Sequence, residues 1–239
     1  MLILSNGMIK SGSSLMRHYT IALVDRLFAG TGQKELRRLV RAKHFHGSGS
    51  FINHLGVATL ASLLTISDEY GPVIVKVHLK PEPFLLEALR AGRIKMTYIH
   101  RDPRDVVLSA MDHRVRSQGT PKPVFTGYGS IEESISHVHL MCKAACEWIS
   151  TGLACVVRYD NLLLAPEKEL SRICAYLNLP ASETDIEQVI QEERQIRQPG
   201  KNQFNIGQLT RFQTEMSEEQ LKTCNQGLRD VIVQLGYSI

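Results

Sequence analysis

The sequence predicts a three-layer α/β fold, in which helices flank a central, mostly parallel sheet on both faces. Short apolar runs typical of buried strands alternate with longer stretches of helical periodicity, which is the pattern of a parallel sheet with crossover helices. The first run, residues 2–4, is followed at once by a loop of small residues and a helical pattern. The 239 residues contain no repeat, low-complexity tract or linker, so we expect residues 1–239 to form a single domain.

Four strands are expected, at residues 2–4, 72–79, 94–100 and 154–159. Side chains alternate across a strand, so the second strand should carry Ile74, Lys76 and His78 on one side and its valines on the other. Lys76 and His78 then lie near the carboxyl end of the strand, where ligands of open parallel sheets bind. A strand that runs into solvent, with His78 as an ordinary surface histidine, would give the same pattern.

Helices are expected at residues 13–27, 34–43, 53–66, 83–91, 131–149 and 182–194, and further helices should begin at Pro103, Pro166 and Ser217. Asp102 is a suitable N-cap for the helix that Pro103 opens. Ser217 and Gln220 have the spacing of a capping box before the last helix, which we expect to continue to Gly236.

The loop at residues 8–14 joins the first strand to the first helix and predicts an anion site. Its backbone N–H groups and the positive end of the helix point to the same place. Lys10 adds a full positive charge, and hydroxyl donors come from Ser11, Ser13 and Ser14. Gly7 and Gly12 have the spacing of a P-loop, but Ser13 stands where that motif has its lysine. An ordinary turn rich in small residues is the alternative.

A second charged corner follows the third strand and reads Arg-Asp-Pro-Arg-Asp over residues 101–105. Arg101 is expected in the strand-to-helix corner with its guanidinium fork available to a phosphate. Alternatively, Arg101 and Arg104 pair only with Asp102 and Asp105.

Composition excludes several classes of protein. The net charge of +4 is too small and too dispersed for a nucleic-acid-binding protein, although it suits an anionic ligand. No apolar stretch reaches the roughly 18 residues of a membrane span. The five cysteines form no Cys-x-x-Cys pair, which predicts reduced, mostly buried thiols. Together with a start that lacks signal-peptide character, this favours a cytoplasmic protein.

Four stretches together resemble the sulfotransferases that use 3′-phosphoadenosine 5′-phosphosulfate (PAPS). Residues 10–14, Lys-Ser-Gly-Ser-Ser, resemble the family's Pro-Lys-Ser-Gly-Thr-Thr loop. Residues 76–79 resemble its Lys-Thr-His-Leu-Pro segment, and residues 101–109 resemble its Arg-Asn-Pro-Lys-Asp-Val-x-x-Ser element. Residues 159–162 more weakly resemble Tyr-Glu-Asp-Leu. The resemblance covers residues 1 to about 180, in the family's order and spacing.

The resemblance implies a P-loop-like fold, PAPS as donor, 3′-phosphoadenosine 5′-phosphate (PAP) as product, no metal, and a hydroxyl-bearing, small-molecule acceptor. It implies catalytic roles for Lys10, for Lys76 and for His78 as general base. It implies donor contacts for Lys10, Ser11, Gly12, Ser13, Ser14, Arg101, Ser109 and Tyr159. Neither a nucleic acid nor a membrane is expected as partner, and the sequence leaves the oligomeric state open.

Two departures from the family pattern are visible. Leu15 stands where the family has an adenine-stacking aromatic residue. The basic C-terminal motif is eroded, so that Lys201, Asn205 or Arg211 would have to complete the site for the 3′-phosphate. The acceptor pocket should come from residues 43–53, 80–84 and 116–130, where the aromatic residues are Phe45, Phe51 and Phe125.

Two other functions stay open at this point. One is a P-loop kinase that uses ATP and magnesium, with Asp160 as the metal-binding acid; the missing lysine after Gly12 speaks against it. The other is a non-catalytic nucleotide-binding relative, and the presence of both Lys10 and His78 speaks against that.

Overall fold

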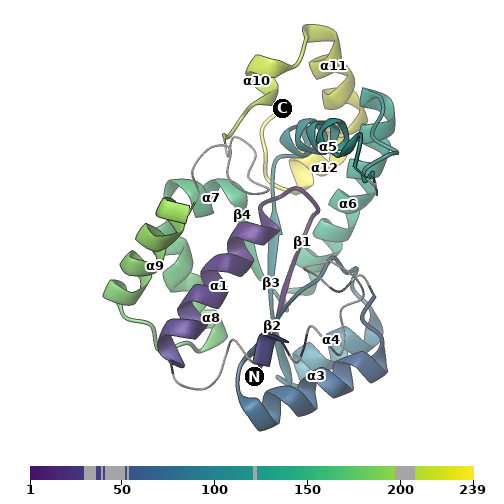
Figure 1. Ribbon diagram of the computed structural model, residues 1–239. Helices are drawn as coiled ribbons and strands as arrows, with labels where there is room; N and C mark the ends of the chain where they lie inside the picture. The colour runs from purple at the N-terminus through teal and green to yellow at the C-terminus, as the bar shows by residue number, and fades with distance from the viewer. Residues whose placement is uncertain (30–35, 39, 41–51, 53, 121–122, 197–207) are drawn as a thin grey trace.

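The computed structural model describes residues 1–29, 36–38, 40, 52, 54–120, 123–196 and 208–239. A four-stranded parallel sheet lies at its centre (Figure 1), in agreement with the predicted fold class. The strands, in sheet order, are β2 (Val73–Lys76), β1 (Leu2–Gly7), β3 (Ile94–His100) and β4 (Cys155–Arg158). Because β2 pairs with one side of β1 and β3 with the other, the order of the strands reverses at β1. The crevice outside the carboxyl ends of strands at such a point is the usual ligand site of an open α/β sheet.

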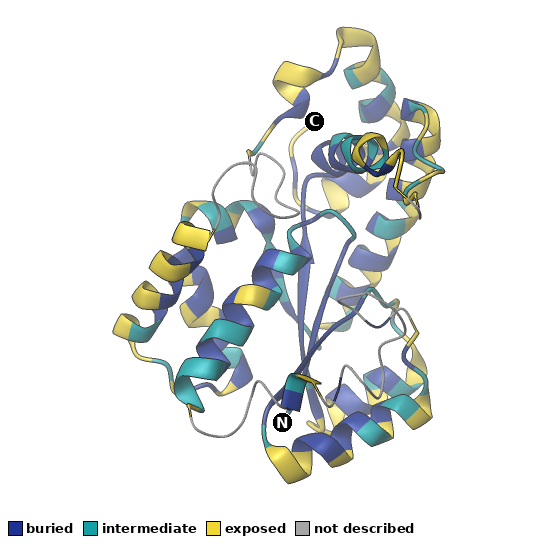
Figure 2. Cartoon of the chain, in the orientation of Figure 1, coloured by how far each residue is buried: buried dark blue, intermediate teal, exposed yellow. Residues whose placement is uncertain are grey.

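Helices cover both faces of the sheet (Figure 1), and each face has its own apolar core. Ile3, Ile74 and Ile99 face one layer, which consists of α1 (Ser13–Leu27), α7 (Tyr159–Leu164), α8 (Pro166–Leu177) and α9 (Glu183–Ile196). Leu4, Val75 and Met96 face the other layer, which consists of α3 (Val57–Tyr70), α4 (Pro83–Arg90), α5 (Pro103–Ser117), α6 (Ile131–Thr151), α10 (Phe212–Glu215), α11 (Glu218–Gly227) and α12 (Arg229–Gln234). Figure 2 shows the buried strands between partly exposed helices. Sheets buried on both faces need apolar side chains on both sides of each strand, as found here.

Three strand ends differ from the prediction, and all three lie at the edge where ligands would bind. β1 continues to Gly7, because Asn6 and Gly7 still pair with β3. β2 ends at Lys76, so His78 lies in the segment that follows the strand rather than in it. Tyr159 is not the last residue of β4 but the first of the short helix α7, which the sequence did not indicate.

The predicted helix signals are largely confirmed. The Asp102 carboxylate accepts the Arg104 N–H at the start of α5, and Ser217 forms the expected capping box with Gln220. The helix expected from residue 53 begins only at Val57, and the helix expected at residues 34–43 lies mostly outside the described residues.

The single helix expected after Ser217 is wrong. It is interrupted at Leu228, which separates α11 from α12 and is itself fully buried. A Cβ at Gly227 would come within 2.7 Å of the Ile135 side chain on α6. The interruption thus lies next to a close approach of α6, and helical periodicity carries no sign of such a contact.

All five cysteines are free thiols and four of them are buried, as predicted. Among the helices of the described residues, none is both long and apolar enough for a membrane crossing.

Candidate active site

The loop after β1 is shaped by two residues with positive φ, Lys10 (68°) and Gly12 (90°). A Cβ at Gly12 would overlap the Tyr159 ring, so only glycine fits at this position. The Ser11 hydroxyl lies 2.6 Å from Met8 O and 3.1 Å from Ile99 O. This hydroxyl therefore ties the loop to β3, and the contact of Ser11 with the donor stays a prediction. Ser13 and Ser14 form the first turn of α1, whose N–H groups lack acceptors within the helix.

Two lysines lie at the loop, the half-buried Lys10 within it and the buried Lys76 at the end of β2. The Lys10 Nζ lies 2.9 Å from His113 Nδ1 on α5, and the Lys76 Nζ donates to Ser14 Oγ at 2.9 Å. Burial lowers the pKa of Lys10 to about 8, and the positive charges of Arg116 and Lys76 add to this effect. Burial likewise lowers the pKa of Lys76 to about 8. Positive charge is thus concentrated at the loop, as an anion site requires.

His78 contacts the same loop from the segment after β2. Its Nδ1 lies 2.7 Å from Gly7 O. A carbonyl oxygen can only accept, so Nδ1 carries the proton and the imidazole lone pair lies on Nε2. Burial lowers the pKa of His78 to about 4, so the ring is neutral at neutral pH. A neutral ring with a fixed tautomer is the form that a general base needs.

Sequence reasoning missed Asn6, the fully buried residue that fixes this segment. Asn6 Oδ1 accepts the N–H groups of Gly7 (2.8 Å) and Leu79 (3.0 Å), and Asn6 Nδ2 donates to Leu79 O (3.1 Å). The Trp148 indole N–H donates to the same carbonyl at 2.7 Å. Leu79, the residue after His78, is therefore held to Gly7 at the start of the loop. A buried amide directly before a glycine loop was the signal that could have indicated this role.

Arg101 lies after β3, and part of its guanidinium is engaged by neighbouring residues. Its Nη2 donates to Asp105 Oδ2 (2.8 Å) and to Gln208 O (2.6 Å), while Arg104 pairs with Asp102. The two ion pairs of the alternative are therefore present, but Arg101 does not pair with a carboxylate only, and its role at a phosphate stays a prediction. Its Nε is nevertheless buried without a hydrogen-bond partner among the described residues. An unsatisfied buried donor of this kind is costly, and a bound anion would satisfy it.

The remaining candidates divide into three groups. Ser109 is buried on α5, and Leu15, a residue of α1, is buried in the core, so Leu15 offers no platform for a base. Arg211 donates to Asp112 and Glu215, which engages its guanidinium in structural ion pairs. Lys201, Asn205, Phe45 and Phe51 lie outside the described residues.

The structure brings the candidates from four segments to one edge of the sheet. The Arg101 guanidinium stacks on the Tyr159 ring at 4.6 Å, and the ring of Tyr159 fits against Gly12 in the loop that carries Lys10. His78 reaches the same loop through Gly7, and Lys76 reaches it through Ser14. Lys10, His78 and Arg101 therefore surround one loop, at the point where the strand order reverses.

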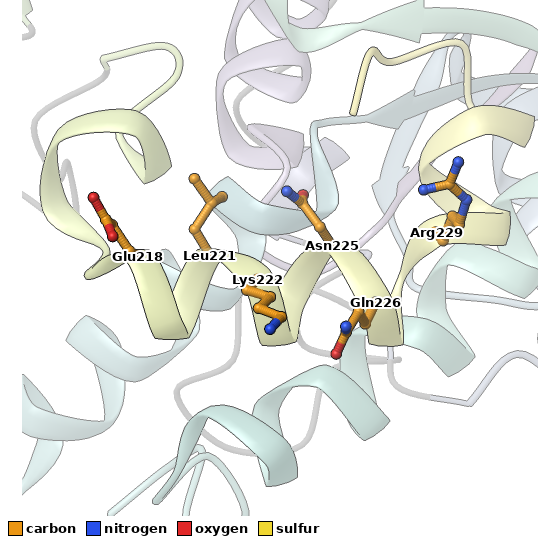
Figure 3. A pocket seen from close by; sticks show the side chains of 6 residues that line it. All are labelled: Glu218, Leu221, Lys222, Asn225, Gln226 and Arg229. Atoms are coloured by element: carbon orange, nitrogen blue, oxygen red, sulfur yellow. The ribbon is translucent and has the colours of Figure 1, made fainter.

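A cavity of about 350 Å³ lies elsewhere, along α11 (Figure 3). It is lined by Glu218, Leu221, Lys222, Asn225, Gln226 and Arg229, none of which is a predicted site residue. Within the described part of the chain, no group of three or more His, Cys, Asp or Glu side chains could hold a metal ion.

Comparison with known proteins points to one family. The sulfotransferase domain family matches residues 3–227. Retinol dehydratase bound to retinol and PAP has a similar structure, with a TM-score of 0.59, 16% sequence identity and coverage of 100% of this chain and 82% of that one. A mouse sulfotransferase complexed with PAP gives 0.61 at 11% identity, over 97% and 84% of the two chains. An Arabidopsis thaliana putative steroid sulphotransferase gives 0.57 at 15% identity, over 100% and 78%. No curated protein sequence matches the chain.

Proposed function

The chain belongs to the sulfotransferase family, and we propose that it transfers the sulfuryl group of PAPS to a hydroxyl of a small-molecule acceptor. The observation that carries this proposal is the convergence of Lys10, His78 and Arg101 on one glycine-shaped loop. Two neighbours of similar structure hold PAP, and one of them also holds retinol. Both ligands agree with the proposed donor and acceptor classes.

The donor's 5′-phosphate would bind the first-turn N–H groups of α1 at Ser13 and Ser14. Arg101 and Ser109 would hold the 3′-phosphate, and the buried Arg101 Nε is the group that supports this assignment. Tyr159 would form the wall behind both, since its ring already contacts Gly12 and Arg101.

Sulfuryl transfer, like phosphoryl transfer, is expected to depend on positioning and charge stabilisation more than on covalent chemistry with the protein. Lys10 would neutralise the negative charge that develops on the leaving oxygen, and Lys76 would contact the sulfuryl oxygens. His78 would take the acceptor hydroxyl's proton on Nε2, because Nδ1 is committed to Gly7 O. These groups need no metal to supply the positive charge.

Turnover of sulfur-labelled PAPS against a panel of small hydroxyl compounds tests the proposal. A Lys10→Met variant should lose turnover, whereas the matched Lys95→Met variant should retain it. Lys95 lies on β3, but its ammonium lies over the Tyr176 ring rather than at the loop. Failure of the wild-type protein to release PAP with any acceptor, or equal activity of the two variants, would contradict the proposal.

The same assay separates the two alternatives. A kinase would consume ATP with magnesium, with Asp160 as its acid, yet Asp160 pairs with Arg158 at the start of α7. A non-catalytic relative would bind PAP without turning PAPS over. Donor turnover without added metal excludes both.

A further inference from the structure

The role of His113 on α5 is not explained by donor binding or by proton transfer. Its Nδ1 lies 2.9 Å from the Lys10 Nζ, which is a direct side-chain hydrogen bond between two residues 103 positions apart. Lysine ammonium groups have donors only, so the imidazole nitrogen must be the acceptor.

The His113 ring is held in place by an aromatic row. Phe125 contacts it at a centroid distance of 4.8 Å, Tyr128 contacts Phe125 at 5.1 Å, and His137 on α6 stacks on Tyr128 at 4.9 Å. Phe125 also lies 5.9 Å from the Lys10 ammonium. The acceptor nitrogen of His113 is therefore presented to Lys10 by packed rings rather than by a mobile side chain.

The surrounding charges explain why Lys10 needs such a partner. Arg116, Lys76 and Arg101 all raise the positive potential at its ammonium, and Asp112 alone opposes them among the groups that act on it. His113 faces Lys10 and Arg116, and burial together with these charges lowers its pKa to about 4. The ring is therefore neutral at neutral pH and keeps a lone pair for Lys10. A carboxylate in this place would cancel the charge that an anion site needs, whereas imidazole does not.

We propose that His113 is the positioning residue of Lys10: its neutral imidazole accepts a hydrogen bond from the ammonium and holds that charge beside the loop before the donor binds. The contact itself is independent of the reaction. Its consequence for turnover depends on the proposed function.

Competitive acetylation of the donor-free protein over a pH series, read by mass spectrometry of the Lys10 and Lys76 peptides, measures each amine's pKa separately. In His113→Leu, the pKa of Lys10 should fall by about one pH unit, because a charged group loses a hydrogen-bond acceptor. That of Lys76 should stay the same. In His113→Asn, whose side chain offers a carbonyl oxygen as acceptor, the pKa of Lys10 should return most of the way to its wild-type value. His137→Leu changes the far end of the aromatic row. It is the matched control and should leave the pKa of Lys10 unaltered.

Turnover supplies the second measurement. His113→Leu should lower kcat/KM for PAPS by about tenfold or more, as expected for one lost hydrogen bond to a charged group, and His113→Asn should recover it. An unchanged or raised Lys10 pKa in folded His113→Leu protein overturns the proposal, and so does a folded His113→Asn protein that behaves like the leucine variant. Labelling needs no donor, so these outcomes are distinct from a failure of the sulfotransferase assay.

Discussion

Replacing Asn6 by alanine should damage both stability and catalysis, in amounts that follow from its contacts. Asn6 is fully buried, and its Oδ1 is the acceptor for the N–H groups of Gly7 and Leu79. The variant leaves both donors buried, at about 1–3 kcal/mol each, so the free energy of unfolding should fall by about 2–6 kcal/mol. The carbonyl of Leu79 loses less, since it keeps the indole N–H of Trp148. Urea unfolding followed by circular dichroism measures the loss.

The catalytic effect of Asn6→Ala should pass through His78. The amide fixes Gly7, which accepts the imidazole N–H, and Leu79, which follows the histidine. We therefore expect kcat to fall, and to fall much less when the same change is made in a His78→Ala background, because interacting positions are not additive. A matched control is Thr20→Val, whose buried hydroxyl donates to Met16 O within α1; it should cost stability but not kcat. An equal loss of kcat in both backgrounds would refute the reasoning.

The remaining predictions concern the charged groups of the site. His78→Ala should lower kcat by about 10²–10⁴, the usual contribution of a general base, and unchanged turnover of PAPS would remove His78 from the mechanism. Arg101→Ala should weaken PAP binding by about 1.5–3 kcal/mol but leave the affinity for adenosine 5′-phosphate nearly the same, which calorimetry measures; an equal loss for both ligands contradicts a 3′-phosphate contact. Burial lowers the pKa of His78 and His100 from 6.5 to about 4, so both bind a proton on unfolding near pH 5. Stability should therefore fall as pH decreases from 6.5 towards 4, by about 1.4 kcal/mol per pH unit for each histidine, and His100→Gln should remove one histidine's share of that slope in urea unfolding. At pH 8, PAP binding should take up about one proton in total, because Lys10 and Lys76 are then each about half protonated and an anion raises both pKa values. Calorimetric heats that do not depend on the ionisation enthalpy of the buffer would contradict this.

Local patterns predicted the fold well, because the signals involved act over a few residues. The alternation in residues 73–77 assigned Val75 and Ile74 to opposite cores, and both assignments are confirmed. The N-cap at Asp102 and the capping box at Ser217 are also confirmed, since each depends on hydrogen bonds within one turn. The break at Leu228 was not predicted, because the apolar periodicity continues across it.

The site was less accessible to sequence reasoning, because its contacts join residues about 70 to 110 positions apart. Asn6 with Leu79, Lys10 with His113, and Arg101 with Gln208 O each depend on how separate segments meet at the sheet edge. The i, i+4 spacing of Arg101 and Asp105 showed that the two could pair. The sequence did not show that both side chains are buried, which is what brings them into contact. The family motifs identified the charged residues, and the packing identified their partners.

The cations of the described residues differ in the groups that compensate them, and Arg101, which pairs with Asp105 but keeps a buried Nε without a partner, stands between the two kinds. Arg104, Arg158 and Arg211 each contact a carboxylate, which fixes helix ends and the C-terminal segment. The ammonium of Lys10 instead contacts a neutral imidazole, and that of Lys76 contacts a hydroxyl. Neutral acceptors satisfy hydrogen bonds without removing charge, so the two lysines continue to repel each other and part of the stability is given up in the absence of ligand. An anion at the loop would relieve that repulsion, which makes ligand binding and folding stability linked quantities at this site.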